Sequence, residues 1–176
     1  MPKHLSVDTI NDDHFKIVSN NLHLQDSRFI EVSNNSEATL TGTTATIVPF
    51  DNTLSSKDPS PSIFSLNNNQ VVIDSEASTR HYTIDVCVNM ANATISRDPK
   101  EGSVWIEVNS TEVAGSRRYV YLAPDSDASQ GSAIIHKVVE LAADDYVEVW
   151  GERVSAAGDN IKFLIDCTLT IKEWGV

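Results

Sequence analysis

Apolar and polar residues alternate along most of the chain, and the alternation is clearest in the stretch YTIDVCVNM. Tyr82, Ile84, Val86, Val88 and Met90 fall on one side of this stretch, with polar residues between them. A repeat of two residues places successive side chains on opposite faces of a β-strand and does not fit a helix. The pattern therefore predicts a strand with one apolar face turned toward a core.

Similar alternation predicts strands in ATLTGTTATIVPF, IFSL, QVVID, SVWIEVN, RRYVYLAP, SAIIHKVVEL and KFLIDCTLTIKEW. In the last of these, we expect a long central strand with an inward row of Phe163, Ile165, Cys167, Leu169 and Ile171. The stretch DNTLSSKDPSPS contains two prolines and predicts a loop. Short strands separated by turn residues at this spacing are typical of an antiparallel β-sandwich. We therefore predict an all-β fold of roughly eight to ten strands.

The stretch VVELAADDYVEVWG, Val138 to Gly151, contains two alternating apolar runs separated by the acidic pair Asp144-Asp145. We expect a hairpin in which this pair forms a solvated turn, with Val147 and Val149 facing the core and Glu148 facing away.

The first 35 residues differ from the rest, because their apolar residues are too few to form a core of their own. A short hairpin is expected around Asn20-Asn21. We predict that residues 1–35 form an extended arm that anchors the protein to a partner, and that residues 36–176 form the sandwich. The arm's predicted contact residues are Phe15, Ile17, Leu22, Leu24 and Phe29.

The net charge of −12 argues against a nucleic-acid partner, because phosphates are held chiefly by lysine and arginine. No stretch approaches the roughly 18 apolar residues that span a bilayer, and the first residues do not resemble a secretory leader. We therefore expect synthesis in a cytoplasm and no membrane partner. Cys87 falls on a polar strand face and Cys167 on an apolar one, which predicts two free thiols.

Residues that support catalysis or metal binding do not form a recognisable pattern. The five histidines lack metal-ligand spacing, and no phosphate-binding glycine loop or nucleophile elbow occurs. Acidic turns at Asp125 to Asp127 and at Asp144-Asp145 are compatible with calcium, although solvated turns are commoner. Distant carboxylates that converge in a sandwich stay open as a route to glycoside hydrolysis. We expect no cofactor, no metal and no enzymatic activity.

Five aromatic residues form the main candidate interface: Trp105, Tyr119, Tyr121, Tyr146 and Trp150. Trp105, Tyr146 and Trp150 alternate out of step with the aliphatic residues of their strands, so they are expected to lie outside the inner core. Such residues suit a sugar-binding platform or a contact between subunits.

From Thr39 to Trp174 the order of strands resembles the jelly roll of tumour necrosis factor ligands and complement globular heads. In that family the central strand follows Gly-x-Tyr-x-Phe and a late turn follows Leu-x-x-Gly-Asp-x-Val. The corresponding segments here are RHYTI, residues 80–84, and LAADDYV, residues 141–147, with Arg80 and Asp144 in place of the glycines. The resemblance implies a homotrimer in which the five aromatic residues contribute to the subunit contact.

Together these features favour a structural protein of a virus particle. We expect a trimeric decoration protein that binds the major capsid protein of a bacteriophage head and stabilises the capsid surface through its arm. A receptor-binding tip of a tail fibre is the first alternative. A secreted ligand of the tumour necrosis factor or complement type is the second.

Overall fold

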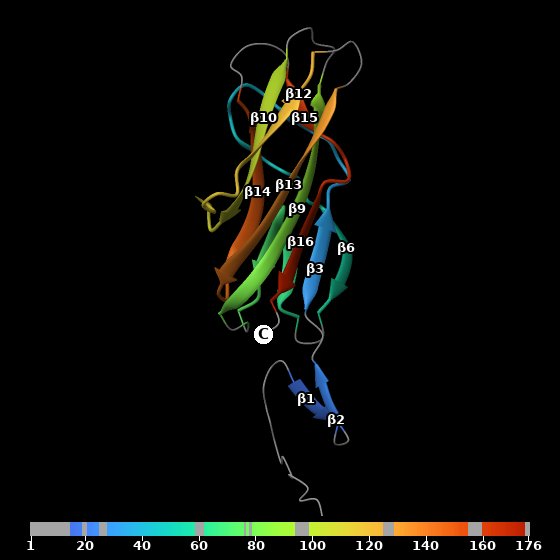
Figure 1. Ribbon diagram of the computed structural model, residues 1–176, viewed down its shortest axis with the longest axis vertical. Helices are drawn as coiled ribbons and strands as arrows, with labels where there is room; N and C mark the ends of the chain where they lie inside the picture. Colours follow the sequence, from blue (N-terminus) through green and yellow to red (C-terminus); the bar gives the residue numbers. More distant parts are fainter. Residues whose placement is uncertain are drawn as a thin grey trace, which may run out of the picture.

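The computed structural model describes residues 15–18, 21–24, 28–58, 62–75, 77, 79–93, 99–124, 129–154 and 160–174. The regular structure of these residues is entirely β (Figure 1). Two antiparallel seven-stranded sheets form a sandwich, which confirms the predicted all-β antiparallel fold. A two-stranded hairpin precedes them, and the described part of the chain contains no helix long and apolar enough to cross a membrane.

The first sheet, called here the β9 sheet, is built around the strand with the clearest alternation. Its strand β9 pairs with β13, β15 and β16, and β16 lies between β9 and β3 (Figure 1). The strands of this sheet are β3 (Phe29–Ser33), β4 (Ala38–Leu40), β6 (Asn52–Lys57), β9 (Arg80–Asn92), β13 (Gln130–Leu141), β15 (Ile161–Phe163) and β16 (Thr168–Glu173).

The second sheet, called here the β14 sheet, carries the candidate aromatic residues. Its strand β14 pairs with β10, β8 and β5, and β10 also pairs with β11 and β12. The strands of this sheet are β5 (Thr46–Ile47), β7 (Phe64–Asn67), β8 (Gln70–Ile73), β10 (Lys100–Val108), β11 (Thr111–Glu112), β12 (Arg118–Leu122) and β14 (Tyr146–Arg153).

The core lies between the two sheets and is formed by the residues that alternation placed inward. The five inward residues of β9 are at most 2% exposed, and Val147 and Val149 on β14 are fully buried. Tight turns connect neighbouring strands where asparagine permits a left-handed backbone. Asn68 and Asn69 have φ of 48° and 69°, and Asn109 has 51°, as hairpin turns of this kind require.

Val138 to Gly151 is not a hairpin, although its two strands and the inward positions of Val147 and Val149 are as predicted. β13 belongs to the β9 sheet and β14 to the β14 sheet, so the turn between them passes from one sheet to the other. Asp144 has φ of 67° at the position where the resembling family has glycine. The backbone N–H of Asp144 donates to the carbonyl of Ile73 at 3.0 Å, which ties this turn to β8.

The terminal stretch is two strands and not the one long strand predicted. A turn around Asp166, whose φ is 64°, separates β15 from β16, and Ile165 in this turn is 50% exposed. The predicted central position of the last strand is confirmed for β16, and Cys167, Leu169 and Ile171 are fully buried.

The predicted loop after residue 50 contains a strand. β6 pairs with β3 at the edge of the β9 sheet, and most of its side chains are exposed. An edge strand with so little buried surface carries no apolar alternation, which explains why the sequence pattern missed it.

The predicted boundary between arm and sandwich at residue 35 is also corrected. β3 lies inside the β9 sheet between β16 and β6, and it supplies the buried residues Ile30 and Val32 to the core. Phe29, predicted to belong to the arm, is the first residue of β3. The sandwich therefore begins no later than this residue.

The two cysteines are free, as predicted. Cys167 is fully buried, and burial raises the pKa of its thiol to about 11. Cys87 is half-buried on the opposite face of the β9 sheet.

We predict that iodoacetamide at pH 8 modifies Cys87 in the native protein while Cys167 stays unmodified until the chain unfolds. The thiolate is the reacting form, and the raised pKa of Cys167 leaves little of it at this pH. Peptide mass spectrometry after timed alkylation measures both rates. Equal rates in the native protein, or a Cys87–Cys167 disulfide, would contradict the assigned faces.

Candidate binding face

All five candidate aromatic residues converge on the outer face of the β14 sheet. Trp105 pairs directly with Trp150 across β10 and β14, and Tyr119 and Tyr121 pair with Ser103 and Glu101. Residues directly opposite in an antiparallel ladder point to the same face. The neighbouring positions Val104, Ile106, Val147 and Val149 fill the core, so the aromatic set faces outward.

Trp105 lies outside the inner core, as its position in the alternation predicts. Its ring is nevertheless covered by other side chains of the same subunit. The residue is 4% exposed, and the Arg117 guanidinium carbon lies 3.8 Å from its ring centroid. Its indole N–H donates to Glu107 Oε1 at 2.8 Å. Trp105 is therefore a buried support of the face, with little surface left for a partner.

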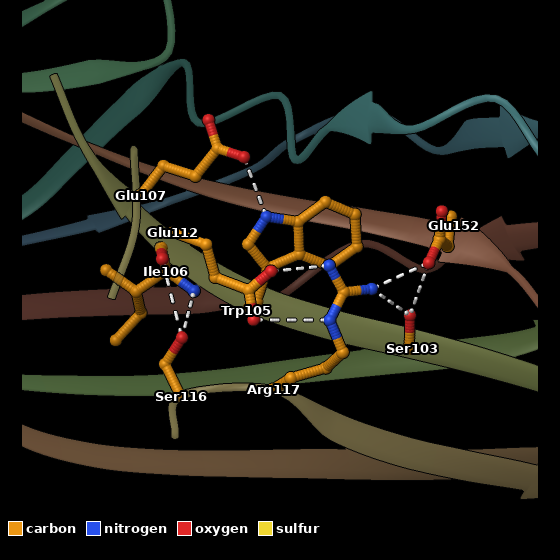
Figure 2. Close-up of polar contacts among 8 residues, drawn as sticks. All are labelled: Ser103, Trp105, Ile106, Glu107, Glu112, Ser116, Arg117 and Glu152. Carbon is orange, nitrogen blue, oxygen red and sulfur yellow. Dashed lines mark hydrogen bonds and ion pairs between the residues drawn. The ribbon is translucent and has the colours of Figure 1, made fainter. Parts of the chain in front are cut away.

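Arg117 holds this part of the face together (Figure 2). Its Nε and Nη2 donate to the two oxygens of Glu112 at 3.3 and 2.6 Å, and its Nη1 donates to Glu152 Oε1 at 2.6 Å. Nη1 also donates to Ser103 Oγ at 3.1 Å. The hydrogen bond with Glu112 is the main cause that raises the pKa of Arg117 above its usual value. The Arg117 side chain thus links β10, β11 and β14.

Trp150 is half-buried and forms a second indole–carboxylate pair beside the first. Its indole N–H donates to Glu148 Oε2 at 3.1 Å. Gln70 Nε2 donates to the other oxygen of Glu148 at 2.7 Å, and Glu148 is only 5% exposed. Glu148 thus points away from the core, as predicted, but its carboxylate is buried among side chains of the outer face.

Tyr146 is half-buried at the end of the face and is held by the turn between β10 and β11. Its hydroxyl lies 2.8 Å from Ser110 Oγ, and its backbone N–H donates to Asn109 Oδ1 at 3.1 Å. Asn109 Nδ2 also donates to Asp145 Oδ1 at 2.7 Å. One Asp145 oxygen is used here and the other accepts from the N–H of Ala142, so the turn itself accounts for the Asp145 carboxylate.

Tyr119 and Tyr121 are the freely exposed members of the set, at 61% and 65%. They lie on β12, next to β13, where Ile134 is 71% exposed and Val138 is 44% exposed. The sequence interpretation missed Ile134 and Val138 as surface residues. The available signal was that SAIIHKVVEL carries apolar residues at both parities, so one set had to face outward.

The described residues of the predicted arm form two strands that pair with each other. β1 (Phe15–Val18) and β2 (Asn21–Leu24) form the expected hairpin, with Phe15 opposite Leu24 and Ile17 opposite Leu22. Their role as anchors stays a prediction.

Two histidine–carboxylate pairs lie on the outer face of the β9 sheet, away from the aromatic set. His136 Nδ1 is 2.6 Å from Asp85 Oδ1, and His81 Nε2 is 3.9 Å from Glu140 Oε2. Within the described ranges, histidine, cysteine and carboxylate side chains do not gather in groups of three or more that suit a metal ion. The acidic turn at residues 125–127 lies outside those ranges.

We predict that Arg117→Lys lowers the free energy of unfolding by about 1–2 kcal/mol, because lysine cannot stack on Trp105 while holding two carboxylates. Urea denaturation at one fixed protein concentration measures the loss. Arg118→Lys is the matched control, since Arg118 is exposed and donates to the carbonyls of Gly115 and Arg117. A change within about 0.5 kcal/mol is expected there. Equal losses in both variants would contradict the assigned role of Arg117.

Comparison with known proteins supports the fold and leaves the function open. No protein-family model matches the chain, and no curated protein matches its sequence. Crystal structures of murine APRIL at pH 8.5, 5.0 and 8.0 match the fold with TM-scores of 0.55, 0.51 and 0.51. Sequence identity is 11–12%, and each match covers 85% of this chain and all of the other. The chain therefore has the jelly-roll fold of the tumour necrosis factor type, as the sequence resemblance predicted.

Proposed function

We propose that the protein is a non-catalytic, homotrimeric jelly-roll knob that acts by binding other proteins. The observation that carries this proposal is the side of the sandwich where β12 and β13 meet. Four exposed apolar or aromatic side chains flank this edge, Tyr119 and Tyr121 on the outer face of the β14 sheet and Ile134 and Val138 on the outer face of the β9 sheet.

The two strands are the open edges of their sheets. Within the described residues β12 pairs only with β10, and β13 pairs only with β9. They lie close together, since a Cβ added at Gly131 would be 2.6 Å from Val120 Cγ1. Unpaired edges beside exposed apolar residues invite association, and natural proteins cover such edges. A subunit contact at this edge provides the cover.

We propose a trimer because the fold and such an edge contact together support it. An edge of one subunit that packs on a different surface of the next makes a head-to-tail contact, which closes into a ring at a suitable rotation. The resemblance to the tumour necrosis factor family favours a ring of three. Of the five aromatic residues predicted at the contact, Tyr119 and Tyr121 have the surface available for it.

Two features favour binding over catalysis. The carboxylates around Arg117 are held by hydrogen bonds that support the sheet. The histidine–carboxylate pairs lie on an open sheet face, with side-chain exposures of 54–66%. Such exposure offers no water-excluded site of the kind that acid–base catalysis uses.

The hairpin β1–β2 is the proposed anchor. Its strands pair with each other and with no other described strand. An isolated two-stranded hairpin is marginally stable in water, so a partner surface would stabilise it. In its most specific form the proposal makes this partner the major capsid protein of a bacteriophage, with the knob decorating the capsid surface.

A ligand of the tumour necrosis factor type is the second candidate, and the fold match to murine APRIL favours it. The two candidates differ in where the protein is found. A decoration protein copurifies with particles in many copies, whereas a free ligand does not copurify with them.

We predict that the full chain has three times the mass of one subunit by size-exclusion chromatography with light scattering. Ile134→Lys should yield monomers, because it places a charge in the proposed subunit contact. Ile165→Lys is the control, since Ile165 is 50% exposed in the turn between β15 and β16 and the trimer should persist. A stable wild-type monomer at micromolar concentration would refute the trimer.

We predict that a chain starting at residue 28 folds and forms the same oligomer but no longer binds particles. A chain starting at residue 36 should not fold, because it lacks β3 with Ile30 and Val32. Circular dichroism and cosedimentation with purified particles measure the two effects. Particle binding retained by residues 28–176 would show that the hairpin is not the anchor.

A further inference from the structure

The outer face of the β14 sheet contains two similar indole–carboxylate pairs side by side. Trp105 donates to Glu107, and Trp150 donates to Glu148, in each case through the indole N–H. The register places Trp105 opposite Trp150 and Glu107 opposite Glu148. The two pairs therefore form one continuous surface across β10 and β14.

The surroundings of Trp105 show how a guanidinium can be held on this face. The Arg117 guanidinium stacks 3.8 Å from the indole centroid while Glu112 and Glu152 accept its hydrogen bonds (Figure 2). A planar guanidinium suits this setting because it can stack on an aromatic ring and donate to two carboxylates at once. The chain thus already holds one arginine in this way.

The Trp150 pair likewise joins an exposed-side indole to a carboxylate, and Glu107 lies directly opposite that carboxylate as a second acceptor. Among the described residues the cation–π contact is at Trp105, and the ion pairs include neither Glu107 nor Glu148. Like charges directly opposite on neighbouring strands are destabilising, and a buried carboxylate without a counter-ion is costly. Glu148 is 5% exposed, and its carboxylate accepts hydrogen bonds from the neutral side chains of Gln70 and Trp150.

The surroundings favour a cation supplied by another protein. Glu101, Glu107, Glu112, Glu148 and Glu152 lie on this face by register, and Arg117 is committed to Glu112 and Glu152. The net charge of −12 would steer a basic surface toward the chain. A divalent metal is a poorer fit, because the described side chains supply no group of three suitable ligands here.

We propose that Trp150, Glu148 and Glu107 form a seat for an arginine side chain exposed on a partner protein. The arginine stacks on the half-buried Trp150 as Arg117 stacks on Trp105, and its guanidinium donates to the two facing carboxylates. The seat lies on a sheet face distinct from the β12–β13 edge and from the hairpin. It therefore does not rest on the trimer or on capsid binding.

The indole N–H signals of the full-length protein provide a direct test, because the chain has three tryptophans. The probe is the peptide acetyl-Gly-Arg-Gly-amide, titrated at millimolar concentration and followed by ¹⁵N–¹H correlation spectra, with Trp150→Phe identifying its signal. We expect a saturable shift of the Trp150 signal and little change at the exposed Trp174. The same peptide with citrulline, which is neutral and nearly the same shape, should cause no such shift.

Variants separate the seat from general charge effects. Glu107→Gln should weaken peptide binding about tenfold, because a charged hydrogen bond of this kind is worth roughly 1.5 kcal/mol or more. Glu107 is half-buried, so this variant is expected to fold even if Glu148→Gln does not. Glu140→Gln on the other sheet is the matched control and should bind as the wild type does.

Four results would overturn the proposal, the last of them obtained with calcium. The Trp150 signal stays unchanged with the arginine peptide, or citrulline shifts it equally, or Glu140→Gln weakens binding as much as Glu107→Gln. Calcium alone is added in a separate titration. If calcium shifts the Trp150 signal and blocks the peptide at equimolar concentration, the seat is a metal site and the arginine assignment is wrong.

Discussion

The register between β10 and β14 is the constraint on which both the core and the outer face depend. It places Ile106 opposite Val149 inside the sandwich, and in the same ladder it places Trp105 opposite Trp150 outside. A slip of one residue would expose the aliphatic residues and bury the tryptophans and glutamates. The stacking of Arg117 on Trp105, with hydrogen bonds to β11 and β14, reinforces this register from the outside.

Alternation in the sequence predicted the strands that bury one face, because burial selects apolar residues at every second position. It therefore predicted β9 and the parity of Cys87 and Cys167 correctly. It failed where burial is slight or the chain turns without a glycine or proline. β6 is an exposed edge strand, and the turn at Asp166 interrupts a stretch in which the alternation of apolar and polar residues continues unbroken. Alternation also does not show which strands pair with each other. For this reason the link from β13 to β14 was predicted as a hairpin although the two strands lie in different sheets.

The candidate face was partly predictable for the same reason. Parity placed Trp105, Tyr146 and Trp150 outside the core, but only the fold shows that they share one face with Tyr119 and Tyr121. The sequence gives no sign that Arg117 covers Trp105, because the contact depends on a loop folding back over β10. The boundary of the arm was misplaced because β3 is short and its apolar residues complete a core made mostly by distant segments.

Two surfaces with different chemistry emerge, an apolar edge at β12–β13 and an acidic aromatic face around Trp150. We propose that the edge forms contacts between copies of the chain and that the face binds other proteins. A structure of the assembled oligomer at side-chain resolution tests this division most directly. We expect three subunits around a threefold axis, with Tyr121 and Ile134 buried between them and Trp150 left accessible. An assembly that buries Trp150 between subunits and leaves Ile134 in solvent would contradict it.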